Sequence, residues 1–142
     1  MVIIGFCAPS KTGKTTFLEG LIPYLINDSH IKGPIGVIKH CHHELNNRPN
    51  NDSNRLRRAG ADHVIASTDS DFNRVLSSLP KCTLILVEGF RSAPIPFFLL
   101  QRGKEDKNWK APKNIIETID ITIFEPSIQQ VLTTIHRLLL AQ

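Results

Sequence analysis

The sequence predicts a three-layer α/β fold, in which helices cover both faces of a mainly parallel β-sheet. Short runs that are apolar at nearly every position alternate with segments whose apolar residues recur at helical spacing. Such continuous apolar runs are typical of strands that are buried on both faces. Alternating strands and helices form right-handed βαβ units, which place the carboxyl ends of the strands at one edge of the sheet, where ligands of such folds bind.

Six strands and four helices account for this pattern. The strands are expected at Met1–Cys7, Ile35–Lys39, His63–Ser67, Thr83–Val87, Phe97–Gln101 and Ile119–Phe124. The first helix is expected from a stripe of apolar residues, Phe17, Leu18, Leu21, Ile22 and Leu25, and the second is the basic helix Ser53–Ala59, which Gly60 would end. A third helix would carry Phe72, Val75, Leu76 and Leu79 on one side, with Asp69 or Ser70 as its N-cap. The last helix is expected at Ser127–Leu140. The polar stretches around His40–Asn54 and Arg102–Asn114 are expected to be surface loops.

Length and composition favour a single nucleotide-binding domain spanning residues 1–142. The net charge of +4 suits a bound triphosphate, and one Trp and one Tyr are few aromatic residues for a nucleic-acid partner. The three cysteines lack paired spacing, as is typical of a reducing compartment. Because neither a cationic leader nor an apolar run of about 20 residues is present, we expect a cytoplasmic protein without membrane or nucleic-acid partners.

A phosphate-binding loop is predicted where the first strand meets the first helix. Successive backbone N–H groups of such a loop point at the phosphates, and the following helix N-terminus adds partial positive charge. The residues expected to surround the nucleotide are Ala8, Pro9, Ser10, Lys11, Thr12, Gly13, Lys14, Thr15 and Thr16. The competing interpretation is an ordinary strand-to-helix turn, but the buried strand before the motif and the amphipathic helix after it are the context that a phosphate loop requires.

Individual residues of the loop have distinct expected roles. Gly13 permits close backbone approach, Lys14 neutralises phosphate oxygens, and the Thr15 hydroxyl is a ligand for Mg²⁺. Ala8 replaces the first glycine of the pattern, which costs little if its φ is negative. Lys11 is open to two interpretations, a second phosphate contact or a lysine that points to solvent.

Two carboxylates are expected near the metal ion. Glu88 ends an apolar strand beside a turn glycine, and Asp52 lies in the polar loop that follows another strand. Each could hold Mg²⁺ or its water, so Lys14, Glu88 and Asp52 are the candidate catalytic residues, and Thr15, Glu88 and Asp52 are the candidate metal ligands. The alternative for Glu88 is a structural ion pair with Arg91.

A histidine-rich segment follows the second strand. His40, His42 and His43 with Cys41 suggest zinc, but adjacent histidines tend to point apart and no matching ligand pair is present, so polar contact with phosphate or substrate is the preferred interpretation. Arg55 could bind an anion, or could belong to an exposed basic helix face together with Arg57 and Arg58. The remaining histidines, His30, His63 and His136, carry no recognisable spacing.

These motifs together resemble one family. The GKTT loop ending at Thr16, Ile38–His43, Asp52–Ala61 and Leu86–Phe90 occur in the order and spacing of the molybdopterin-guanine dinucleotide biosynthesis protein B (MobB) family, over roughly the first 90 residues. The resemblance implies a GTP-binding, weakly GTP-hydrolysing phosphate-loop protein with a Rossmann-like P-loop NTPase fold, typically a homodimer. It also implies an adaptor role beside the MobA-type guanylyltransferase that attaches GMP to molybdopterin.

The sequence departs from the family in several places. Ala8 and Lys11 stand where glycines are common, and Pro96–Leu100 is more apolar than usual, which suits a buried strand or a subunit interface. Guanine specificity rests on the resemblance, because no Asn-Lys-x-Asp motif is present. No general acid or base is obvious, so slow hydrolysis is expected.

Two other functions stay open at this point. One is an ATP-dependent small-molecule kinase or ligase on the same fold, with Arg102–Asn114 as its lid. The other is a non-catalytic module that docks a partner through Phe97–Leu100.

Overall fold

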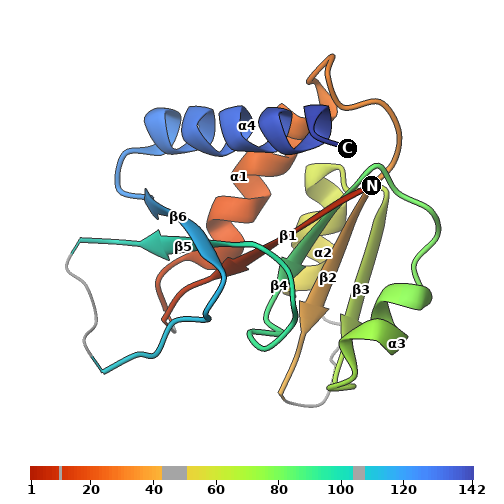
Figure 1. The fold of residues 1–142 in the computed structure, drawn as a ribbon, viewed down its shortest axis with the longest axis horizontal. Coiled ribbons are helices and arrows are strands. Elements are labelled where there is room, and N and C mark those ends of the chain that lie inside the picture. Colours follow the sequence, from red (N-terminus) through yellow and green to blue (C-terminus); the bar gives the residue numbers. More distant parts are fainter. Residues whose placement is uncertain (10, 43–50, 104–107) are drawn as a thin grey trace.

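A computed structural model describes residues 1–9, 11–42, 51–103 and 108–142. Its centre is a six-stranded sheet in the order β3-β2-β4-β1-β5-β6 (Figure 1). The strands are β1 (Val2–Cys7), β2 (Ile35–His40), β3 (His63–Ser67), β4 (Leu84–Glu88), β5 (Phe97–Gln101) and β6 (Ile115–Asp120). Every neighbouring pair is parallel, so the carboxyl ends of all six strands point to one edge.

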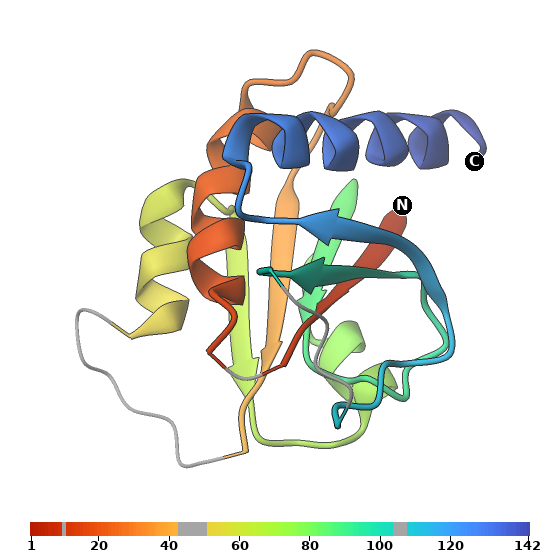
Figure 2. The same ribbon diagram turned by 90° about the vertical axis from the view of Figure 1, so that its left-hand side faces the viewer.

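Four helices cover the sheet: α1 (Lys14–Ile26), α2 (Asp52–Ala59), α3 (Phe72–Ser77) and α4 (Phe124–Leu140). Buried residues of α1, α2 and α4 share one hydrophobic core, while Val75 of α3 belongs to a second core on the opposite face. The two views show α1, α2 and α4 on one side of the sheet and the short α3 on the other (Figures 1 and 2). The three-layer, Rossmann-like P-loop fold expected from the sequence is confirmed.

The fifth strand is part of the interior. β5 lies between β1 and β6, and its Phe97, Phe98 and Leu100 are fully buried. Phe98 packs against Phe6 of β1 at a centroid distance of 5.3 Å. The expectation of a partner-docking surface at Phe97–Leu100 is therefore wrong, and the buried-strand interpretation of this apolar run is confirmed.

The last strand begins four residues earlier in the chain than the sequence predicts. β6 covers Ile115–Asp120, and the segment expected to be a strand, Ile119–Phe124, is mostly turn and helix start. Asp120 ends the strand, because its Oδ1 accepts hydrogen bonds from the backbone N–H and the hydroxyl of Thr122, at 3.0 and 2.5 Å. α4 consequently begins at Phe124, three residues before the expected Ser127.

The third helix is capped by a different residue from either expected one. Asp71 accepts a hydrogen bond from the backbone N–H of Arg74 at 3.1 Å and is the N-cap, whereas Asp69 accepts one from the backbone N–H of Asp71. The helix ends at Ser77, so Leu79 packs from the following turn. Within the described part of the chain, no helix has the length and apolar character needed to cross a membrane.

Candidate nucleotide-binding site

The predicted phosphate loop lies between β1 and α1, at the carboxyl edge of the sheet. Gly13 is the N-cap of α1 with a φ of +100°, a left-handed conformation that L side chains rarely adopt. Its carbonyl accepts a hydrogen bond from the backbone N–H of Phe17 at 2.9 Å, which closes the first helical turn. A Cβ at this position would lie 3.1 Å from Nη2 of Arg102. Of the predicted loop residues, Ser10 lies outside the described part of the chain.

The two positions where the loop departs from the family that it resembles behave differently. Ala8 has an ordinary negative φ, because among the described residues other than glycine only Lys11 and Phe90 have a positive φ. Replacement of glycine by alanine at this position therefore causes little backbone strain. Lys11 has a φ of 64°, and its side chain is exposed. A left-handed conformation explains why glycine suits that position. A phosphate contact by Lys11 stays a prediction.

The structure brings the three predicted metal ligands together. The Thr15 hydroxyl, on the first turn of α1, lies 3.2 Å from Oδ2 of Asp52 and 3.3 Å from Oε1 of Glu88. Asp52 begins α2 and Glu88 ends β4, so three separate elements supply the cluster. The second oxygen of Glu88 is buried and has no hydrogen-bond partner among the described residues. A buried carboxylate oxygen without a partner is costly unless a ligand satisfies it.

Lys39 is the site residue that the sequence reasoning missed. Its ammonium lies 2.8 Å from Oε1 of Glu88 and 3.0 Å from Oδ2 of Asp52, at the end of β2. Burial favours the neutral amine, but the charge of Glu88 and the hydrogen bonds to both carboxylates outweigh it and raise the pKa of Lys39. The available signal was a lone lysine near the end of an otherwise apolar run, a position where a charge needs a partner.

Lys14 begins α1 beside the same carboxylates. Its ammonium lies 3.9 Å from Oε1 of Glu88. Desolvation by burial lowers the pKa of Lys14, with a smaller contribution from Lys39, while Glu88 works in the opposite direction. Arg91, the partner of Glu88 in the alternative interpretation, places its guanidinium 5.5 Å from the centre of the Trp109 ring.

The ion pairs also shift the pKa of Asp52. Burial raises it, but the hydrogen bond and the charge of Lys39, with the Thr15 hydroxyl and Arg55, bring the pKa below its usual value. Asp52 is thus held as a carboxylate in contact with Thr15.

The histidine segment packs against the turn after β4. The His40 ring stacks on Phe90 with a centroid distance of 4.4 Å, and His42 meets His40 edge-on at 4.8 Å. Phe90 has a positive φ, and a Cβ at Gly89 would lie 2.7 Å from the Cβ of His40, so this turn is both strained and closely packed. His43 lies outside the described residues. Ligand contact by His40 and His42 stays a prediction.

Arg55 is engaged within the protein. Its guanidinium forms a two-pronged contact with the Glu19 carboxylate, at 3.0 and 3.1 Å, and donates to the Thr16 hydroxyl at 3.2 Å. These contacts join α2 to α1 behind the phosphate loop. Anion binding by Arg55 stays a prediction, and it would require Arg55 to give up a bidentate ion pair.

A cavity of about 1000 Å³ opens beside the cluster. Its walls include Lys14, Lys39 and Glu88 on one side and Phe90 and Trp109 on the other. Arg102, at the start of the loop expected to act as a lid, donates from Nε to the Thr12 carbonyl at 2.9 Å. Residues 109–114 of that loop line the cavity, whereas residues 104–107 lie outside the described ones.

The sequence matches the model of a known protein family. Residues 3–121 match the family model described as "Molybdopterin guanine dinucleotide synthesis protein B", MobB. The chain belongs to the MobB family. The resemblance given by the GKTT loop, the histidine segment and the turn at Glu88 is thereby confirmed over a longer stretch than those motifs alone cover.

Relatives with curated names extend the comparison. The chain is 36% identical over 121 residues to the molybdopterin-guanine dinucleotide biosynthesis adapter protein of Haemophilus influenzae, covering 74% of this chain and 66% of the relative. It is 35% identical over 117 residues to the Escherichia coli protein of the same name, covering 70% and 65%. The matched regions thus span just under two thirds of the length of these MobB relatives.

One solved structure supports the fold. The crystal structure named molybdopterin-guanine biosynthesis protein B (mobB) superimposes with a TM-score of 0.55 at 18% identity, covering 94% of this chain and 99% of the other. At that identity the likeness establishes the shared fold of this MobB chain and nothing finer.

Proposed function

We propose that this chain binds GTP with Mg²⁺ at the phosphate loop and acts as an adaptor with slow GTPase activity in molybdopterin guanine dinucleotide biosynthesis. The observation that carries the proposal is the contact of the Thr15 hydroxyl with both Asp52 and Glu88, one residue from Lys14. A phosphate loop that begins a helix supplies backbone N–H groups for the phosphates, and a hydroxyl flanked by carboxylates supplies oxygens for a hard cation.

The donor set suits Mg²⁺. Thr15, Asp52 and Glu88 offer oxygens alone, the ligand type that Mg²⁺ prefers, and the unpartnered oxygen of Glu88 is available to the ion or its water. The ion would supply positive charge to the phosphate oxygens. Lys14 would add a second charge at the phosphates, and the backbone at Gly13 would allow close approach.

Slow hydrolysis follows from how the two carboxylates are used. Oδ2 of Asp52 and Oε1 of Glu88 both contact the Lys39 ammonium, so neither of these two oxygens is free to take a proton from water as a general base. We therefore expect turnover well below about 10 s⁻¹, the median for enzymes.

The pathway role rests on the family and on the adapter-protein names of the two relatives. The expected partner is a MobA-type guanylyltransferase, and the second ligand is molybdopterin. The cavity beside Lys14 and Glu88, at about 1000 Å³, is large enough to hold a ligand in addition to the phosphates.

The proposal is tested by titrating GTP and ATP, each with and without Mg²⁺. GTP should bind more tightly than ATP, and removal of Mg²⁺ should weaken it. Tighter ATP binding would overturn the guanine assignment and favour the alternative of an ATP-dependent kinase or ligase.

A lysine variant tests the phosphate contact. Lys14→Ala should reduce the free energy of GTP binding by about 1.5–3 kcal/mol. Lys32→Ala, which removes an exposed lysine at the opposite edge of the sheet, is the matched control.

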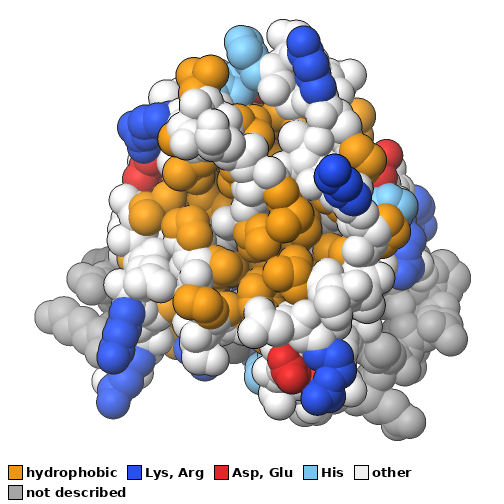
Figure 3. All heavy atoms as spheres, turned by 45° about the vertical axis from the view of Figure 1, so that its right-hand side comes forward, with side chains coloured by type: hydrophobic (Ala, Val, Ile, Leu, Met, Phe, Trp, Pro, Cys, Tyr) orange, Lys and Arg blue, Asp and Glu red, His pale blue; other side chains and the backbone are white. Residues whose placement is uncertain are grey.

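We also propose that the chain forms a homodimer through the face of the sheet that carries α3. Among the described residues, the six-residue α3 is the one helix on that face, and apolar side chains gather across it (Figure 3). Partly buried apolar residues at its surface include Ile3, Phe72, Leu76 and Leu79. Light scattering should give twice the mass of one chain, and Leu76→Glu should shift the mass toward the monomer. A wild-type chain that is monomeric at high concentration would contradict this assembly.

A further inference from the structure

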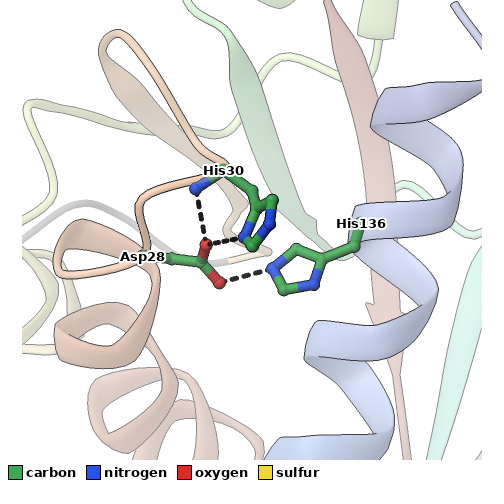
Figure 4. Close-up of side chains that lie close together, drawn as sticks. All are labelled: Asp28, His30 and His136. Carbon is green, nitrogen blue, oxygen red and sulfur yellow. Dashed lines mark hydrogen bonds and ion pairs between the residues drawn. The ribbon is translucent and has the colours of Figure 1, made fainter.

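Three side chains converge at the end of the sheet opposite the phosphate loop. Asp28 and His30 lie in the loop between α1 and β2, and His136 projects from α4 (Figure 4). One potential ligand atom from each lies within 4.8 Å of the other two. Because this loop precedes β2 whereas the phosphate loop follows β1, the parallel strands place the two at opposite edges.

Both imidazoles direct a ring nitrogen at the same carboxylate. Nδ1 of His30 lies 3.1 Å from Oδ1 of Asp28, and Nε2 of His136 lies 2.5 Å from Oδ2. The ring centroids are 4.6 Å apart with an interplanar angle of 44°. The backbone N–H of His30 also donates to Oδ1 of Asp28 at 2.8 Å, which fixes the carboxylate in a turn.

The carboxylate at the centre of this cluster is almost completely removed from solvent. The Asp28 side chain is 9% exposed, compared with 30% for His136 and 69% for His30. The cluster stays accessible from the side of His30, whose side chain is the most exposed of the three.

We propose that Asp28, His30 and His136 form a binding site for a divalent transition-metal ion of the Zn²⁺ type. Two imidazole nitrogens and one carboxylate oxygen are a donor set that Zn²⁺ uses with an open fourth position. With metal–ligand bonds of about 2.0–2.2 Å, tetrahedral ligands lie about 3.4 Å apart, so the ligand atoms need to move by no more than about 1.4 Å. The ion takes the place of the protons that the imidazoles share with Asp28.

The bound ion would join distant parts of the chain. Asp28 and His136 are separated by 108 positions, so the ion would tie the C-terminal helix α4 to the end of α1. His136 also lies outside residues 3–121, the segment matched by the family model.

This cluster differs from the proposed Mg²⁺ site at Thr15 in position and in ligand type, because the Thr15 site offers oxygen ligands alone.

The test is a titration of the full chain with Zn²⁺ and with Co²⁺ in excess Mg²⁺, which prefers oxygen ligands and leaves imidazole sites free. We expect one Co²⁺ per chain, a visible spectrum of a four- or five-coordinate ion, and no thiolate charge-transfer band, because no cysteine belongs to the cluster.

Two variants test the ligands. Asp28→Asn keeps an acceptor for the His30 backbone N–H, and His136→Gln removes the second imidazole. Each should weaken Zn²⁺ affinity by more than about 100-fold, beyond the loss typical of residues that only support a ligand.

Matched controls separate this cluster from the other histidines. His63→Gln changes a histidine on β3, and His42→Gln changes the histidine segment beside the phosphate loop. Both should retain wild-type Zn²⁺ affinity, and Zn²⁺ should raise their thermal midpoints as it does for the wild type. A wild-type chain that binds Zn²⁺ no more tightly than His136→Gln would overturn the proposal and leave a purely hydrogen-bonded triad. Loss of binding in His42→Gln would assign the metal to the histidine segment and overturn it equally.

Discussion

Lys39 and Glu88 face each other at the ends of two neighbouring strands, with the Lys39 ammonium 2.8 Å from Oε1 of Glu88. The two residues are register partners in the pairing of β2 with β4. Asp52 approaches the same ammonium at 3.0 Å from α2. Lys39 thus contacts both carboxylates that are expected to serve Mg²⁺, whereas Lys14 lies 3.9 Å from Glu88 and Arg55 lies 3.7 Å from Asp52.

Removal of that cation should be strongly destabilising. Lys39→Met keeps most of the length of the side chain but leaves the Glu88 carboxylate, whose side chain is 6% exposed, with only the more distant Lys14 at 3.9 Å. The expected loss in the free energy of unfolding is about 3–5 kcal/mol, measured by urea denaturation without Mg²⁺.

A double-mutant cycle isolates the pair. Glu88→Gln in the Lys39→Met background removes the uncompensated charge, so the double variant should be less destabilised than the sum of the single variants. Added Mg²⁺ should recover part of the stability of Lys39→Met but not of the double variant. Additive single effects would show that the pair does not couple.

The lowered pKa of Asp52 predicts a stability change at acid pH. Because the pKa of Asp52 in the folded state lies below its ordinary value of 3.8, its contribution is complete above that value and is lost as pH falls through the folded pKa. Urea unfolding between about pH 5 and pH 2 should show a shallower acid limb for Asp52→Asn than for the wild type. An identical limb would mean that Lys39 does not stabilise the ionised form.

The edge location of the site was predictable from the sequence. A buried strand followed by a glycine-containing turn and an amphipathic helix identified the phosphate loop, and parallel strands fixed the edge at which Glu88 had to lie. The local pattern did not reveal Lys39, because its partners come from α2 and β4, far along the chain. Its only local signal is a charge in an apolar run.

The error at β6 has a different origin. The stretch Ile115–Phe124 contains alternating apolar and polar residues in two possible frames, and β-propensity supports both. Pairing with β5 selects the earlier frame, and Asp120 ends it through its turn with Thr122. The cluster of Asp28 with His136 was out of reach for a related reason, because the two are far apart in sequence and meet only when α4 packs on the sheet.

The three cysteines should differ in reactivity. Cys7 is buried in β1, and desolvation raises its pKa from 9.0 to about 11 despite the opposing charges of Lys14 and Arg91. Cys82 is also buried, and Cys41 is half-buried at the end of β2. Burial also raises the pKa of Cys41 and of Cys82, so access to the sulfur sets the order of reaction. A colorimetric thiol reagent should therefore modify Cys41 first and the other two only after denaturation. Cys41→Ser should remove the fast phase; a fast phase that persists would contradict the burial of Cys7 and Cys82.

Gly13 and Gly103 offer a matched pair for separating backbone strain from nucleotide binding. Both have a positive φ, +100° and +77°. A Cβ at Gly13 meets Arg102 beside the phosphate loop, whereas no atom of the described residues lies within 4 Å of one at Gly103. Alanine at either position should cost about 1–2 kcal/mol of stability, because L residues are strained in the left-handed region. Only Gly13→Ala should also weaken GTP binding, by about tenfold or more, since it disturbs a backbone that is expected to contact charged phosphate. Equal GTP affinity in the two variants, measured by calorimetry, would show that the backbone at Gly13 does not approach the nucleotide.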